Sequence, residues 1–145
     1  MGSGDSKEIW WSGLIGQSRQ VNGRHACLKP KNSNYLEAPS GIPQPYWCYG
    51  VSQNEYFAEF YVARRNQEEN KEILERLQRH REDVERTFGG PLFWDRMEGR
   101  QNARIRYSMS GGYRSSPEER ASIQCDIVRA MSKLEKSLGP YLDRI

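Results

Sequence analysis

The spacing of apolar residues along the chain predicts two long amphipathic helices. Residues 66–88 carry apolar side chains at three- to four-residue spacing, and Asn66 with Glu69 has the pattern of a capping box. Residues 117–138 repeat this spacing behind a serine cap and a proline at the first helical position. Residues 6–20 predict a third helix, which is weaker because glycines interrupt it.

Turn residues delimit the predicted strands, and residues 104–110 show alternation of apolar and polar side chains, whereas both faces of residues 55–64 carry aromatic side chains. Residues 46–52 and 55–64 flank a two-residue turn, and residues 92–97 and 104–110 flank a polar turn, so each pair predicts a hairpin. Shorter strand candidates lie at residues 24–28 and 35–37. Because short turns join neighbouring strands, we expect a mostly antiparallel sheet.

Together these elements predict an α+β fold. The expected order is α-β-β-β-α-β-β-α, with a sheet of about five strands and the helices packed on one face. Leu77 and Ile127 lie in the middle of the two apolar stripes and should be buried. Residues 7–145 form one domain, while residues 1–6 have the composition of a disordered lead or a remnant of cloning.

Composition narrows the class of protein. Aromatic residues make up 11% of the chain, which argues against disorder, and the formal charge of +3 does not by itself imply a polyanionic partner. The basic excess is concentrated in residues 89–115, which carry five basic and two acidic side chains. The three cysteines show no CxxC pair, and no apolar run is long enough to span a membrane, so we expect a cytoplasmic protein without disulfides.

The sequence shows no pattern of catalytic or metal-binding residues. His25 and Cys27 share one face of a candidate strand, but no second ligand pair follows nearby. Glu59 is not followed by a lysine two positions later, as the metal site of restriction-fold nucleases requires. Cys48 lies between aromatic residues and is expected to be a small core residue. We therefore predict no catalytic residues, no metal and no cofactor.

Arginines gather in and beside the predicted strands, interleaved with aromatic residues. This combination can hold phosphates and stack on bases. The candidate nucleic-acid-binding residues are Arg64, Arg65, Trp94, Arg96, Arg100, Arg104 and Arg106, with Lys29 and Lys31 in a second candidate, a polar loop. The alternatives are a solvated sheet face whose arginines are balanced by Glu55, Glu59 and Asp95, and an acidic protein partner.

The arginines at positions 104 and 106 give the sharpest geometric prediction. They alternate with Ile105, Tyr107 and Met109, so both should project from the face opposite the helices, about 6.6–6.8 Å apart. That distance is similar to the spacing of successive phosphates on a nucleic-acid strand. Arg96 would extend the row, with Trp94 as a stacking platform on the same face.

Several stretches of the chain also carry a family resemblance. They are Trp10-Trp11, residues 31–36, 70–74, 85–89, 92–97 and 103–105, and the region from Met131 to Tyr141. From about residue 8 onward the chain resembles an uncharacterised prokaryotic family of about 140 residues. Its members often form the C-terminal part of proteins whose N-terminal part is a predicted nuclease of the restriction-enzyme fold. The resemblance implies an accessory role linked to DNA or phage defence, and it assigns no catalytic residues.

Two main functional hypotheses follow from the sequence, and a third alternative is an enzyme whose site lies in the loop rich in Asn, Ser and Pro at residues 29–43. In the first, the domain is a non-catalytic accessory module that binds DNA or RNA through the basic, aromatic sheet face and positions a fused or separate nuclease domain. In the second, it is a protein-interaction or dimerisation module without nucleic-acid contact. The oligomeric state stays open in both.

Overall fold

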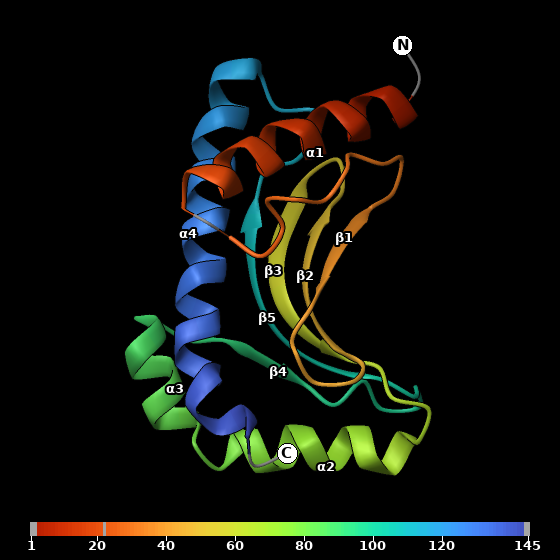
Figure 1. Cartoon of the computed structure of the whole chain (residues 1–145), viewed down its shortest axis with the longest axis vertical. Coiled ribbons are helices and arrows are strands. Elements are labelled where there is room, and N and C mark those ends of the chain that lie inside the picture. Colours follow the sequence, from red (N-terminus) through yellow and green to blue (C-terminus); the bar gives the residue numbers. More distant parts are fainter. Residues whose placement is uncertain (1–2, 22, 144–145) are drawn as a thin grey trace.

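The computed structural model describes residues 3–21 and 23–143, and it confirms the predicted α+β fold. The elements are α1 (Ser3–Gln20), β1 (Tyr35–Pro39), β2 (Pro45–Val51), β3 (Glu55–Val62), α2 (Gln67–Gln78), α3 (Arg81–Phe88), β4 (Phe93–Asp95), β5 (Ala103–Ser110) and α4 (Pro117–Leu142). All neighbouring strands are antiparallel, and the order across the five-stranded sheet is β1-β2-β3-β5-β4. Helix α4 runs alongside the sheet, with α1 crossing near one end and α2 near the other (Figure 1).

One hydrophobic core lies between the sheet and the helices. Alternate residues of β3, from Tyr56 to Val62, point into it, and Ile105 of β5 joins them. Leu77 and Ile127 are each 1% exposed, so both predicted core positions are confirmed.

Two adjacent tryptophans hold α1 in place. Trp10 and Trp11 are fully buried, and the Trp10 ring packs 6.0 Å from the ring of Tyr56. The Trp11 indole donates to the carbonyl of Ser33 at 2.7 Å, and the Gln124 amide of α4 donates to the carbonyl of Trp10 at 2.7 Å. Helix α1 is therefore tied both to α4 and to the segment that precedes β1. It begins at Ser3, earlier than predicted, and residues 1–2 of the expected lead lie outside the described residues.

The predicted strand at residues 24–28 is wrong, because this segment forms consecutive turns. Ala26 donates its N–H to the Gly23 carbonyl, and Leu28 donates to the His25 carbonyl. The His25 ring is buried, with Nε2 2.9 Å from the carbonyl oxygen of Trp47. Burial lowers the pKa of His25 to about 4, which keeps the ring neutral at physiological pH.

The predicted helix at 66–88 divides into two. Asn66 caps α2 as expected by accepting from the Glu69 N–H, but the helix ends at Gln78. The N–H of His80 turns to the Leu77 carbonyl, three residues back, and α3 starts at Arg81. The His80 ring stacks on Tyr141 of α4 at 4.2 Å. The break lets α2 cross the end of the sheet while α3 packs along α4 (Figure 1).

Helix α4 extends beyond the predicted stop at Gly139-Pro140. Pro140 lies inside the helix, which continues to Leu142. Proline removes a backbone hydrogen bond, and here the burial of Leu142 and the stacking of Tyr141 offset that cost.

Candidate functional site

The sheet has a second face, opposite the core, which we call the outer face. Cross-strand neighbours share a face, so the register assigns its residues. One row across the sheet is Glu37, Cys48, Glu59, Arg106 and Phe93, and the next is Pro39, Tyr46, Tyr61, Arg104 and Asp95. A third row is Tyr35, Gly50, Phe57 and Ser108, and the last pair is Glu55 and Ser110. Arg104 and Arg106 therefore do project from the face away from the core, as predicted.

Arg106 is held in place by two neighbours on β3. Its Nε lies 2.9 Å from Oε2 of Glu59, and its guanidinium carbon lies 3.6 Å from the centre of the Phe57 ring. The Phe57 ring in turn covers Gly50, where an added Cβ would lie 1.9 Å from the ring. The Glu59 side chain is only 3% exposed. Burial raises the pKa of Glu59, and the ion pair with Arg106 opposes that rise.

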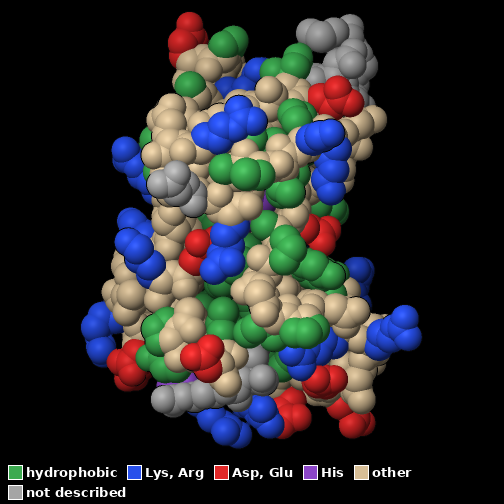
Figure 2. Space-filling model, in the orientation of Figure 1, with side chains coloured by type: hydrophobic (Ala, Val, Ile, Leu, Met, Phe, Trp, Pro, Cys, Tyr) green, Lys and Arg blue, Asp and Glu red, His purple; other side chains and the backbone are tan. Residues whose placement is uncertain are grey.

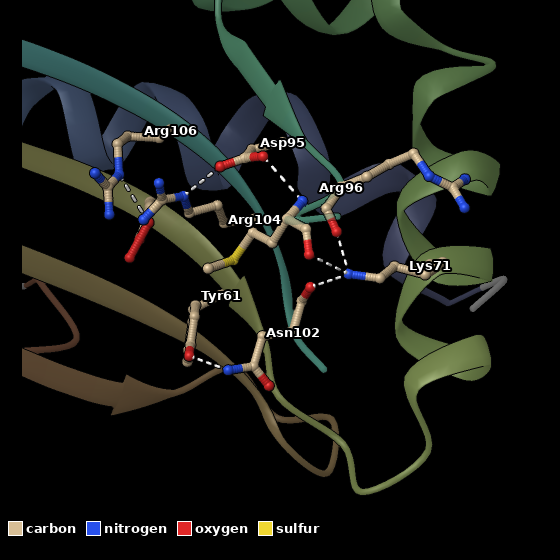
Figure 3. A network of polar contacts seen from close by, with 9 residues as sticks. Tyr61, Lys71, Asp95, Arg96, Asn102, Arg104 and Arg106 are labelled. Carbon is tan, nitrogen blue, oxygen red and sulfur yellow. Dashed lines mark hydrogen bonds and ion pairs between the residues drawn. The ribbon is translucent and has the colours of Figure 1, made fainter. Parts of the chain in front are cut away.

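Arg104 forms the second ion pair of the outer face. Its Nε lies 2.9 Å from Oδ2 of Asp95 on the neighbouring strand, and the other carboxylate oxygen accepts the Met97 N–H at 2.9 Å. Figure 3 shows Arg104 directed at Asp95, with Arg106 beside it. Both guanidinium groups thus neutralise carboxylates of the same face.

The charge balance of the outer face is acidic. The residues in its rows include two arginines, and four carboxylates at Glu37, Glu55, Glu59 and Asp95. Figure 2 shows one side of the whole molecule, where acidic and basic side chains are interspersed and form no continuous basic patch. Phosphate binding depends on uncompensated positive charge. Of the alternatives that the sequence left open, the arrangement matches a face whose arginines are balanced by neighbouring acids.

Two predicted members of the arginine row lie elsewhere. Trp94 pairs with Ile105 and so lies on the core side, where its indole donates to Oε2 of Glu85 at 3.1 Å. Arg96 follows the end of β4 and pairs with Glu75 of α2 and with Glu98. Figure 3 shows Arg96 directed toward α2 and away from Arg104. The expectation that Trp94 and Arg96 share the face of Arg104 and Arg106 is wrong, and Phe93, at 55% exposed, is the aromatic residue of β4 on that face.

The remaining candidate residues divide between paired and unpaired side chains. Arg64 binds Glu69 at 2.5 Å and donates to the carbonyl of Pro43 at 3.0 Å. Arg65, Arg100, Lys29 and Lys31 are exposed, and within residues 3–21 and 23–143 they form no ion pair. Arg65 and Arg100 lie at one corner, because the Gln101 side chain donates to the Arg64 carbonyl at 2.8 Å.

Two neighbouring residues of α2, which the sequence did not single out, organise this corner. The Asn70 side chain accepts the Arg64 N–H and donates to the carbonyls of Arg64 and Gln101. Lys71 is buried and donates to the carbonyls of Arg96, Met97 and Asn102 (Figure 3). Burial lowers the pKa of Lys71. One helical turn therefore fixes both the start of α2 and the connection between β4 and β5.

Two observations concern the reactive side chains of the described residues. Burial raises the pKa of the Cys48 thiol, which keeps it protonated and unreactive at neutral pH. Within the part of the chain that the structure describes, no three His, Cys, Asp or Glu side chains group to hold a metal ion. Likewise, no described helix is long and apolar enough to cross a membrane.

The fold and its outer face define a small α+β domain in which helices cover one side of an antiparallel sheet and ion-paired arginines and aromatic residues occupy the other. The chain belongs to the family described as Domain of unknown function (DUF4268), whose model matches residues 6–142. No curated protein and no solved structure matches the chain.

The three hydrogen bonds from Lys71 to main-chain carbonyls, which we call the lysine cage, lead to a prediction about stability. In the Lys71→Met variant three main-chain carbonyls lose their donor, and we expect the free energy of unfolding to fall by about 2–3 kcal/mol. Lys71→Arg should not restore it, because a planar guanidinium cannot take the place of a compact ammonium among three acceptors. Urea unfolding measures both variants against Lys136→Met, an exposed lysine on α4. A loss below about 0.5 kcal/mol would show that the cage contributes nothing.

The Glu59–Arg106 pair predicts a pH-dependent cost. Arg106→Ala leaves a buried carboxylate without its counter-charge, and we expect a loss of about 3 kcal/mol at pH 8. The pKa of Glu59, already raised by burial, should rise further in this variant. As the pH falls through that pKa the carboxyl becomes neutral, so the loss should shrink at pH 5.

The same unfolding experiment contains its own control. Adding Glu59→Gln to Arg106→Ala removes the unpaired charge and should recover most of the stability at pH 8. An equal loss of stability at both pH values, with no recovery in the double variant, would mean that Arg106 does not stabilise the fold through its ion pair with Glu59.

Proposed function

We propose that this domain is a non-catalytic accessory module that binds another protein domain through its outer face. The single observation that carries the proposal is the chemistry of that face, where the arginines are compensated internally while aromatic rings remain exposed. Tyr35 is 48% exposed and Phe93 is 55% exposed, and they lie on the two edge strands of the sheet.

This combination favours a protein surface as the ligand. The cores of protein interfaces are enriched in aromatic residues and arginine and depleted of uncompensated charge. The Tyr35 ring lies 6.2 Å from the ring of Phe57, beside the Arg106 guanidinium, so aromatic and cationic groups form a continuous strip. A partner that buries this strip does not have to desolvate an unpaired arginine, because the arginines of the outer face already pair with carboxylates.

The family resemblance suggests which protein the partner is. Members of the family often follow a predicted restriction-fold nuclease in the same chain, so a fused or separate nuclease domain is the partner that we propose. The domain would then position the nuclease on its target without itself cutting DNA. This role is argued from association within the family and from the outer face, and the two arguments are independent.

The proposal is tested by mixing the domain with the nuclease part of a family member that carries both parts, produced as a separate chain. We expect complex formation by calorimetry, and at least a tenfold weaker Kd for Tyr35→Asp with Phe93→Asp. Affinity should change little between about 50 and 500 mM salt, since an aromatic interface releases few counterions.

A matched control uses another exposed apolar residue. Ile9 is 43% exposed on α1, away from the outer face, so Ile9→Asp makes the same chemical change without touching the proposed interface. Equal affinity for all variants, or no complex at all, would refute the proposal.

Nucleic-acid binding remains a second candidate because of one observation. Arg65 and Arg100 are exposed and unpaired among the described residues, and the hydrogen bonds of Asn70 and Gln101 bring their segments together at one corner. Two free guanidinium groups on a fixed frame can contact phosphates. In this version of the hypothesis the corner replaces the Arg104 and Arg106 row.

A salt titration with a labelled single strand and a duplex of about 30 nucleotides tests this candidate. If the corner binds phosphates, Arg65→Ala with Arg100→Ala should lower the slope of log affinity against log salt by about 2. Arg114→Ala, an exposed arginine near the opposite end of the sheet, is the control. Failure of the wild type to bind either probe at about 50 mM salt would exclude the nucleic-acid role.

A further inference from the structure

Half of β5 lacks a neighbour on one side. β5 has eight residues, but the three-residue β4 pairs only with Arg104, Ile105 and Arg106. The chain before β4 cannot continue the pairing, because Pro91 has no N–H and the Leu92 N–H donates to Oε2 of Glu85 at 2.7 Å. From Tyr107 to Ser110, β5 therefore has β3 on one side and an open edge on the other.

The direction of the free main-chain groups follows from the hydrogen-bond pattern. Gly111 donates to the Asn54 carbonyl at 3.0 Å, so it faces β3. Antiparallel strands alternate the direction of their main-chain groups from residue to residue. The N–H and C=O groups of Ser108 and Ser110 consequently point to the open edge, and both residues are exposed.

A groove of about 480 Å³ runs beside this edge. Its apolar lining includes Phe88, Tyr107 and Met109, and the rings of Phe88 and Tyr107 lie 5.1 Å apart. One wall is the turn at residues 89–91, and the other is the exposed side of α4. The groove thus lies on the helix side of the sheet, next to a strand edge that can accept hydrogen bonds and donate them.

The α4 wall carries positive charge that the described residues leave unpaired. Arg129 and Lys133 both line the groove and are exposed, and neither forms an ion pair within residues 3–21 and 23–143. Eight other arginines of the described chain do pair with a carboxylate. Asp126 also lines the groove, so its charged lining has a net positive charge of one. The unpaired cations favour an acidic ligand.

We propose that this groove binds an extended acidic peptide segment of a partner protein, which adds as a strand to the open edge of β5. Main-chain hydrogen bonds to Ser108 and Ser110 supply sequence-independent affinity. Alternate side chains of the peptide, opposite Tyr107 and Met109, enter the apolar groove. A carboxylate of the peptide pairs with Arg129 and Lys133.

The shape of the groove favours a single strand over a second copy of the domain. The groove beside the open edge is lined by α4 on one side and by the turn at 89–91 on the other. A second copy that paired through its own β5 would bring its own α4 and its own turn to these walls, whereas a single extended chain brings only itself. The site is also distinct from the outer face, because Tyr107 and Met109 project to the opposite side of the sheet from Arg106.

The experiment begins with a random library of 12-residue peptides displayed on phage and selected on the wild-type domain. We expect enriched peptides in which apolar residues alternate and acidic residues recur. One enriched peptide, made synthetically with a fluorescent label, is then measured by anisotropy. Enrichment no greater than on a surface without the domain would overturn the proposal.

Variants of the domain test the geometry. Ser108→Pro removes an N–H that points to the open edge and leaves the N–H groups that face β3, and we expect at least a tenfold weaker Kd. Arg129→Glu with Lys133→Glu should weaken binding by at least tenfold, whereas Lys136→Glu, on α4 but outside the groove lining, should not. Tyr35→Asp should leave peptide binding unchanged, which separates this site from the outer face.

A change in the peptide covers the case in which Ser108→Pro fails to fold by circular dichroism. Methylating alternate main-chain nitrogens of the peptide removes donors to β5 and keeps every side chain. In one of the two alternating sets of positions, methylation should abolish binding, and in the other it should have little effect. Equal binding of both methylated forms would show that the peptide does not join the sheet and would overturn the proposal.

Discussion

The outer face depends on the need of one buried carboxylate for a counter-charge. Glu59 lies on β3, the central strand, and a carboxylate buried there without a partner would be costly. Arg106 supplies the charge from β5, and the Phe57 ring lies beneath its guanidinium. The ring can occupy that position only because Gly50, its neighbour on β2, has no side chain. The chemistry of three strands is thus arranged around a single ion pair.

This arrangement changes the role of the most conspicuous arginines in the sequence. Strand-borne arginines interleaved with aromatic residues are the pattern expected of a phosphate-binding sheet. In the fold, Arg104 and Arg106 each meet a carboxylate across the strand, so they stabilise the sheet and leave the aromatic edges as the distinctive surface. Among the described arginines that form no ion pair, those at positions 65, 100 and 129 lie in connections or on α4.

Local pattern was sufficient to predict β2, β3 and β5 and the side to which β5 presents its arginines, because a period of two is a property of the strand itself. It failed at residues 24–28, which form turns. It was insufficient for β4. A three-residue strand can place either Leu92 and Trp94 or Phe93 and Asp95 toward the core, and the choice is made by Glu85, which binds the Leu92 N–H and the Trp94 indole from α3. The break between α2 and α3 is also determined by tertiary contacts, because α3 packs against α4, which is distant in the sequence. Asn70 was the available signal for the corner, because it occupies a position three residues before Ile73 where the apolar stripe would otherwise begin.

The hydrogen bonds of Asn70 and Lys71 also determine how the corner of the domain responds to a ligand. A connection between strands ordinarily samples many conformations, and a ligand that selects one of them must overcome that loss of freedom. Here the carbonyls of residues 96, 97, 101 and 102 are already bound by two side chains of one helix. The conformational entropy of this connection is therefore lost when the chain folds and not when a ligand binds. The corner is preorganised, so a ligand that contacts it loses little affinity to conformational entropy.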